Sequence, residues 1–209
     1  MNRLPTKQFC FLLRVLFLFL IFYSLCLPFI AGAAEVGGRI ITSAVWDQAH
    51  SPYLLTGDVR IGGSPDQNQT VELKIEPGVE VKLNGFKIHA GDASEKDGGG
   101  YKGRLVADQA KFVGKGGIEL FFGDENLISK SSFDRVNLIL GKNSNTVSSG
   151  SIQNITMINA NIIVQGGNWK IAGGKIINGS ITHKSLGIPG IGPKTGRFLN
   201  FFMDMVTSP

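Results

Sequence analysis

Carboxylates are the side chains of this sequence that could do chemistry if the fold brought them together. Asp108, Asp124 and Asp134 lie in three successive segments of the chain. Glycoside hydrolysis needs two carboxyl groups about 5–10 Å apart, one as the acid and one as the nucleophile or base. The three aspartates stand in different turn contexts, and the sequence has no Asp-Asp or Asp-x-Asp pair. A lyase would also need a cage of carboxylates for Ca²⁺. We therefore expect no catalytic residue and no cofactor.

Histidine and cysteine give no metal or thiol chemistry either. The three histidines, His50, His89 and His183, are isolated from one another and from carboxylates at ligand spacing. Zinc sites need such clusters, so no metal site is predicted, and His89 is expected on the outward face of a strand. Both cysteines, Cys10 and Cys26, precede residue 35.

The beginning of the chain, 1–34, has the pattern of a secretory signal peptide. Three basic residues and no acidic one precede Glu35, an apolar run covers 15–30, and Ala31-Gly32-Ala33 offers small residues for cleavage. Cleavage would take three of 21 basic residues and none of 16 acidic ones, so the charge falls from +5 to 18 − 16 = +2. We expect an exported protein without cysteine, located in the periplasm, on the cell surface or outside the cell. A retained anchor is the alternative, and it is the one case in which we expect membrane contact.

The segment 187–196 is rich in glycine and resembles the hairpin of helix-hairpin-helix modules, which bind DNA phosphates through backbone N–H groups. The segment before it, 176–184, has the composition of a strand and not of a helix. Because the charge without the signal is also low, we expect no nucleic-acid partner and keep this as a minor alternative.

Short runs of β-favouring residues fill the remaining sequence. Each run is short and is bounded by Gly, Asn, Asp or Pro, with no amphipathic helix between them. The segment 71–83 alternates apolar and charged positions around Pro77-Gly78, where proline fixes φ and glycine permits a tight turn. This pattern predicts an all-β protein.

Three segments of the second half, 128–140, 152–164 and 171–181, align with one another at irregular offsets. The alignment places in common columns Phe133, Met157 and Ile176, then Leu138, Ile162 and Ile181, and then Val136, Ala160 and Gly179. A repeat of about twenty residues is typical of a solenoid, in which each coil buries its apolar side against its neighbours.

Asparagines also fall into columns of this alignment. Asn137 aligns with Asn161, and Asn159 aligns with Asn178. Stacked asparagines can form a ladder of hydrogen bonds between side-chain amides. The alternative is that asparagine marks turns, because it tolerates the left-handed backbone region.

Residues 46–182 resemble the right-handed parallel β-helix domains of secreted bacterial proteins, the pectin-lyase-like superfamily. The resemblance begins at Trp46 and continues through SPYLLTGDVRI at 51–61 and LKIEPGVEV at 73–81. It continues in GRLVA at 103–107 and KFVG at 111–114. The resemblance implies a right-handed solenoid of about six short coils, with structural roles for Trp46, Tyr53, Pro77 and Gly78. It implies no particular activity, because this family includes enzymes, adhesins and structural domains.

The expected organisation is a signal peptide at 1–34, a lead-in at 35–45, a β-helix at 46–185 with an inserted polar loop at 91–101, and a tail at 186–209. A solenoid leaves its last coil uncovered. We expect the tail to form a short helix that covers this coil with Phe198, Phe201, Phe202 and Met205.

The sequence thus predicts an exported, non-catalytic β-helix protein with a structural or surface-interaction role, adhesin-like or binding a glycan or the cell envelope. Its expected partners are a polysaccharide or another envelope protein. The alternative is a carbohydrate-active enzyme, a polysaccharide lyase or hydrolase.

Overall fold

The computed structural model describes residues 32–63, 69–91, 101–141, 148–183 and 204–206. Within these ranges the chain is almost entirely strand, and its helical structure is one 3₁₀ turn, η1 (Gln48–His50). No helix among these residues has the length and apolarity needed to cross a membrane. The expected signal peptide lies outside the described residues as far as Ala31.

Fifteen strands are described, and most of them are short. They are β1 (Ala34–Ile40), β2 (Ala44–Trp46), β3 (Tyr53–Ile61), β4 (Val71–Ile75), β5 (Glu80–Lys82), β6 (Lys87–Ala90), β7 (Gly103–Asp108), β8 (Lys111–Leu120), β9 (Gly123–Ser129), β10 (Ser132–Leu140), β11 (Ser148–Ile158), β12 (Ile162–Val164), β13 (Asn168–Ile177), β14 (Ile181–His183) and β15 (Asp204–Val206).

All strand pairings among these residues are parallel, and they form three ladders. Ladder 1 joins residues 34–36, 53–55, 80–82, 111–113, 132–134, 156–158, 175–177 and 204–206. Ladder 2 joins residues 38–40, 59–61, 87–90, 116–120, 136–140, 162–164 and 181–183. Ladder 3 joins residues 44–46, 71–75, 103–108, 123–129, 148–153 and 168–172.

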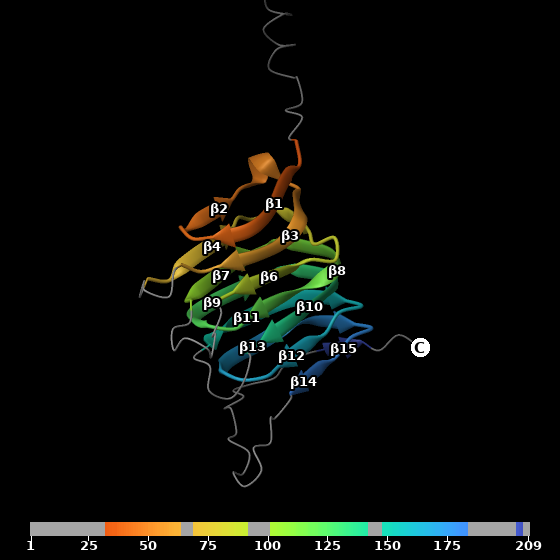
Figure 1. Cartoon of the computed structure of the whole chain (residues 1–209). Helices are drawn as coiled ribbons and strands as arrows, with labels where there is room; N and C mark the ends of the chain where they lie inside the picture. Colours follow the sequence, from red (N-terminus) through yellow and green to blue (C-terminus); the bar gives the residue numbers. More distant parts are fainter. Residues whose placement is uncertain (1–31, 64–68, 92–100, 142–147, 184–203, 207–209) are drawn as a thin grey trace, which may run out of the picture. The chain divides into compact units, whose positions relative to one another are not determined.

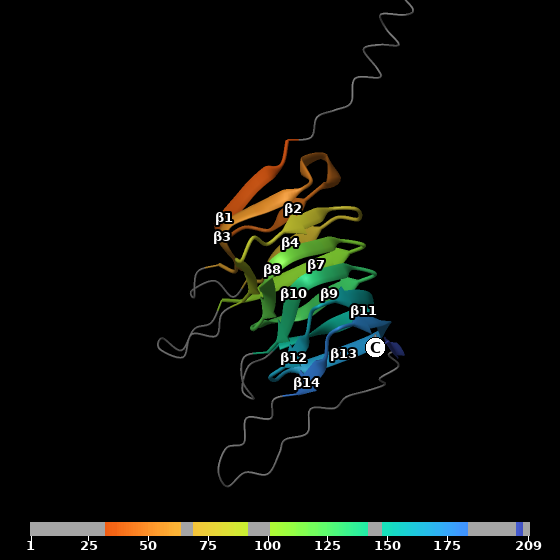
Figure 2. The ribbon, with the colours of Figure 1, turned by 90° about the vertical axis from the view of Figure 1, so that its right-hand side faces the viewer.

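The chain passes through ladder 1, ladder 2 and ladder 3 in that order and then returns to ladder 1. Figures 1 and 2 show the strands stacked in sequence order, from β1 and β2 to β13 and β14. The expected all-β class is confirmed, and the parallel sheet is consistent with a β-helix-like solenoid.

The core is formed by the inward residues of the three ladders. In ladder 1 the column Val81, Phe112, Phe133, Met157 and Ile176 is buried, and each member pairs with the next. The rings of Phe112 and Phe133 stack with their centroids 5.0 Å apart. The pairings Phe133–Met157–Ile176 and Leu138–Ile162–Ile181 reproduce two of the three columns expected from the sequence, because the parallel register places equivalent residues one above another.

The two asparagine columns differ in what they do. Asn161 donates from Nδ2 to Oδ1 of Asn137 at 3.2 Å, and its own Oδ1 accepts from the backbone N–H of Ser180 at 3.0 Å. Asn178 donates from Nδ2 to Oδ1 of Asn159 at 3.3 Å, and both of these residues have a φ of 52°. Hydrogen bonds between side-chain amides are therefore present in both columns. The asparagines of the second column also adopt the left-handed backbone region, which is the alternative interpretation from the sequence.

The residues expected to be structural in the first part of the chain lie at turns and at the end of the core. Trp46 and Tyr53 are buried and stack with ring centroids 4.7 Å apart. The hydroxyl of Tyr53 accepts from the backbone N–H of Asp47 at 2.9 Å. Pro77 and Gly78 form a turn in which Gly78 has a φ of 82°.

The structure differs from the expected boundaries at both ends. Parallel pairing begins at Ala34, so the expected lead-in already belongs to the ladders. A register irregularity between Val36 and Gly38 lets β1 join two of them. At the other end Met205 lies in β15 and pairs with Ile176, so the expected helix is wrong at this residue. Phe198, Phe201 and Phe202 lie outside the described residues.

Changing Gly123 to Ala should destabilise the fold. A Cβ at this position would lie 2.1 Å from the backbone oxygen of Gly103, and the φ of Gly123 is 151°. Because a backbone atom cannot give way cheaply, we expect a loss of about 1–3 kcal/mol in the free energy of unfolding. Chemical denaturation followed by circular dichroism measures it. The matched control is Gly57→Ala, where a Cβ meets nothing within 4 Å; equal losses in both variants would contradict the packing argument.

Changing Asn161 to Ala should break the first amide ladder. The variant leaves Asn137 Oδ1 without its side-chain donor and the Ser180 N–H without its acceptor. We expect a loss of about 1–2 kcal/mol in the free energy of unfolding. Asn168→Ala is the control, because Asn168 is exposed and has no hydrogen bond from its side chain in the described structure. A control variant as unstable as Asn161→Ala would show that the amide contacts contribute nothing.

Candidate functional site

The structure does not bring together Asp108, Asp124 and Asp134, the three aspartates that the sequence analysis tested as a catalytic group and did not support. Asp108 ends β7, where it accepts from the Ser129 hydroxyl at 2.6 Å. Asp124 lies near the start of β9, whereas Ser129 ends the same strand. Since Ser129 is the register partner of Asp108, Asp124 is more than about 10 Å away along the strand direction. Asp134 belongs to ladder 1 and pairs with Arg135 at 3.4 Å. This arrangement differs from the carboxylate pair of a glycoside hydrolase.

The histidines are likewise apart from one another. His50 contacts Asp47 at 2.6 Å on the exposed turn η1, and His183 ends β14. Within the described ranges no three His, Cys, Asp or Glu side chains form a group suited to hold a metal ion. The segment before the glycine-rich hairpin contains the end of β13 and β14, so its described part is strand and not the first helix of a helix-hairpin-helix module. The hairpin itself lies outside the described residues.

A column of outward polar residues on ladder 2 is the feature that sequence reasoning missed. Arg39 pairs in register with Arg60, Arg60 with His89, and His89 with Glu119. Arg60, His89 and Glu119 each stand between two buried residues of their strand, and Arg39 stands between Gly38 and the half-buried Ile40. The alternation of a strand therefore places all four on the outer face of the ladder.

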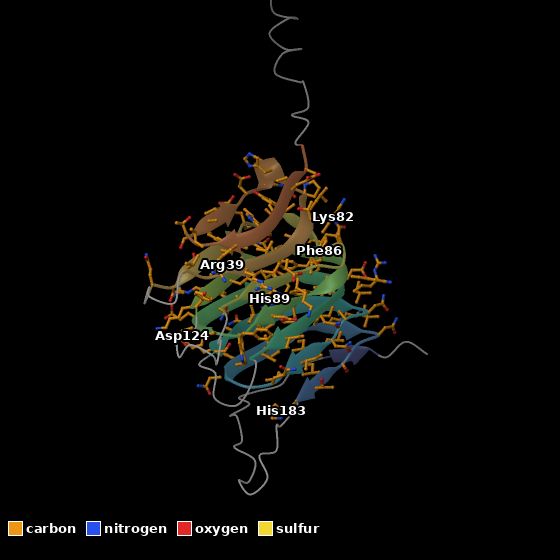
Figure 3. The ribbon with its side chains drawn as sticks, in the orientation of Figure 1. Arg39, Lys82, Phe86, His89, Asp124 and His183 are labelled. Carbon is orange, nitrogen blue, oxygen red and sulfur yellow. The ribbon has the colours of Figure 1, made fainter. Side chains whose placement is uncertain are left out.

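Three of these residues line a pocket of about 170 Å³. Its wall consists of Arg39, Arg60, Ile61, Gly62, His89, Gly91, Tyr101 and Phe121. Arg39 and His89 lie on the same side of the ribbon in Figure 3, over β1 and β6, while Asp124 lies at the edge of that view. Tyr101, at the end of the expected inserted loop, contributes a ring to the wall.

The two arginines of the pocket are distinguished by their lack of carboxylate partners. Among the described arginines, Arg104 pairs with Glu72 and Glu125, and Arg135 pairs with Asp134. In the same ranges neither Arg39 nor Arg60 forms an ion pair. The guanidinium of Arg39 instead lies over the ring of Tyr101, 4.4 Å from its centroid, a cation–π contact that fixes its position.

Glu119 is a buried carboxylate held by the ammonium group of Lys87 and the imidazole ring of His89. Lys87 Nζ lies 2.8 Å from Oε1 and His89 Nδ1 lies 2.9 Å from Oε2, while 6% of the Glu119 side chain is exposed. Burial is the largest influence on this carboxyl and raises its pKa, but the hydrogen bonds from His89 and Lys87 together hold the pKa below its ordinary value. The same contact raises the pKa of Lys87. Glu119 thus stays ionised and orients the His89 ring.

The other ring nitrogen of His89 is left without a hydrogen-bond partner. Nε2 is buried and makes no hydrogen bond in the described structure; Asp58 Oδ2 is 3.8 Å away. An unpaired buried polar atom costs about 1–3 kcal/mol. A ligand atom or a water that reached Nε2 would remove this cost. The pocket therefore combines two unpaired cations, an unsatisfied ring nitrogen and two aromatic rings.

A sequence signal for this column exists but is weak. Gly-Arg-Ile at 38–40, Val-Arg-Ile at 59–61, Ile-His-Ala at 88–90 and Ile-Glu-Leu at 118–120 each place one polar residue between two inward positions. Their spacings are unequal, and they do not match the offsets of the three aligned segments in the second half. That these four residues form one column is seen only from the pairing of the strands.

Comparison of the chain with protein-family models, curated proteins and solved structures gave no match. The assignment of a function therefore depends on the geometry of the pocket.

The Glu119 cluster predicts a specific pH dependence of stability. Because the folded-state pKa of Glu119 is lowered, its ionised form stabilises the folded state above the ordinary pKa of 4.5, and this contribution is lost as the pH falls through the folded-state value. Glu119→Gln should cost about 1–3 kcal/mol at pH 7 and flatten the stability profile below pH 5. Urea denaturation between pH 3 and 7 measures it. The exposed control Glu35→Gln should keep the wild-type profile; a Glu119→Gln profile parallel to wild type would contradict the cluster's role.

Proposed function

We propose that this chain is an exported, non-catalytic protein built on a right-handed parallel β-helix of about six coils and related to the pectin-lyase-like superfamily. It acts by binding a partner on its outer surface, either a glycan or another envelope component. The cyclic order of the three ladders supports the β-helix, and the sequence of residues 1–34 supports export.

The observation that carries the proposal is the pair of arginines without carboxylate partners at a pocket. Surface cations of a merely structural protein are usually solvated singly or paired with carboxylates, as Arg104 and Arg135 are. Arg39 and Arg60 instead line one hollow together with Tyr101 and Phe121. Concave sites with aromatic walls and a few convergent polar groups are typical of ligand binding.

A second candidate function rests on the contact between Glu119 and His89. A carboxylate that orients Nδ1 of a histidine leaves Nε2 as a general base, which is the arrangement of many hydrolases. Among the described residues, the wall of the pocket includes no Ser, Thr or Cys side chain as a nucleophile. Water would have to be the nucleophile, so binding without turnover is the function that the pocket supports better.

Binding of residues 35–209 to immobilised envelope polysaccharides tests the proposal. We expect saturable retention of the wild-type protein, with no release of reducing ends and no new unsaturated sugar from any polysaccharide. A folded protein that binds none of the polysaccharides and no isolated envelope protein would contradict the binding role. Turnover of a polysaccharide that is abolished by His89→Gln would favour the hydrolase instead.

A further inference from the structure

We propose that the pocket on ladder 2 binds the phosphoryl group of a phosphorylated sugar, with Arg39 and Arg60 as the phosphate-binding residues. This inference rests on the proposed binding function and names the chemistry that the pocket recognises.

The positive charge of the pocket wall favours a ligand with negative charge. Arg39 and Arg60 bring two positive charges, and no carboxylate of the described residues lines the pocket. A phosphate monoester carries a charge of about −1.5 to −2 at neutral pH and so balances both guanidinium groups. A single carboxylate would leave one of them uncompensated.

The donor groups fit the shape of a phosphate. Guanidinium groups present paired N–H donors that bind phosphate oxygens in a bidentate manner. Arg39 and Arg60 are register partners on adjacent strands, which lie about 4.8 Å apart. Two guanidinium groups from neighbouring strands can therefore converge on one tetrahedral anion. The stack of Arg39 on Tyr101 restricts one of them before the ligand arrives.

The size and the apolar part of the wall indicate what carries the phosphate. Pockets for drug-sized ligands measure about 300–1,000 Å³, whereas this one measures about 170 Å³. It therefore admits one small group and not an oligomer. The rings of Tyr101 and Phe121 provide apolar surface beside the arginines, which suits the face of a sugar ring. The rest of a polysaccharide would continue along the outside of ladder 2.

Two carboxylates lie next to the pocket, and they determine where in it an anion can bind. Glu119 is paired with Lys87 and His89, so its charge is balanced within the cluster. Asp58 lies 3.8 Å from Nε2 of His89 and accepts from the backbone N–H of Lys87 at 2.9 Å. It opposes an anion at the His89 end of the pocket. The phosphate is therefore placed between the two arginines and not against His89.

Titration calorimetry of residues 35–209 with four probes tests the inference: glucose 6-phosphate, glucose, glucuronate and inorganic phosphate. We expect one site for glucose 6-phosphate, at least about tenfold weaker binding of glucuronate and inorganic phosphate, and no heat from glucose. Equal binding of glucuronate would overturn the phosphate assignment. Equal binding of inorganic phosphate would overturn the sugar part, and binding of glucose as tight as that of glucose 6-phosphate would overturn the phosphate assignment.

Two variants and a charge-matched control locate the site. Arg60→Gln and Arg39→Gln should each weaken glucose 6-phosphate binding about tenfold or more. Lys170→Gln, which removes an exposed cation on ladder 3, should leave it unchanged. An equal loss in all three variants would show non-specific attraction and overturn the site. Thermal unfolding of each variant confirms that it is folded.

Failure of this inference and of the proposed function can be told apart. Polysaccharide retention that survives Arg39→Gln and Arg60→Gln would overturn the pocket while leaving a surface-binding protein. Arginine-dependent binding of glucose 6-phosphate without retention on any envelope component would support the pocket and contradict the envelope role.

Discussion

Parallel backbone pairing in register is the constraint on which the structure depends. Each passage of the chain must present an inward residue above the inward residue of the previous passage, because a slip of one position would turn every side chain to the other face. The column from Val81 through Phe112 and Phe133 to Met157 obeys this rule in ladder 1. The same rule acts on the outer face, where it places Arg39, Arg60 and His89 side by side although they belong to three separate passages of the chain.

The fold was predictable from the sequence where the apolar pattern carries the register. The alignment of Phe133 with Met157 and of Leu138 with Ile162 uses buried residues at matching positions, and the structure pairs them in the same way. The beginning of the ladders was not predictable, because Gly37 and Gly38 interrupt the alternation of β1. The strand at Met205 was mistaken for a helix, since apolar residues at the spacing of a helix also occur in a segment that pairs along an edge.

The pocket could not be predicted because its residues have no common spacing. Segments of unequal length separate the four passages that supply Arg39, Arg60, His89 and Glu119. Inward columns can be recognised in a sequence because packing requires apolar residues there. Outward positions have no such requirement, so any polar residue at them fits the strand pattern whether or not it has a function. The sequence places His89 on an outward face, but the partner that orients it, Glu119, lies on the next passage through ladder 2 and is identified only by pairing.

The outward residues of ladder 2 change from charged to apolar along the stack of strands, and this change restricts where an anionic ligand can bind. It begins with Arg39 and Arg60, continues with the paired His89 and Glu119, and then becomes apolar at Ile139 and Ile163. A buried carboxylate is tolerated at Glu119 because Lys87 compensates its charge and the His89 ring forms a hydrogen bond with it. Arg39 and Arg60 need no such compensation, because both are exposed and remain hydrated. The ladder and Tyr101 therefore hold these two charges in place without neutralising them. An anionic ligand can bind them without first breaking an ion pair.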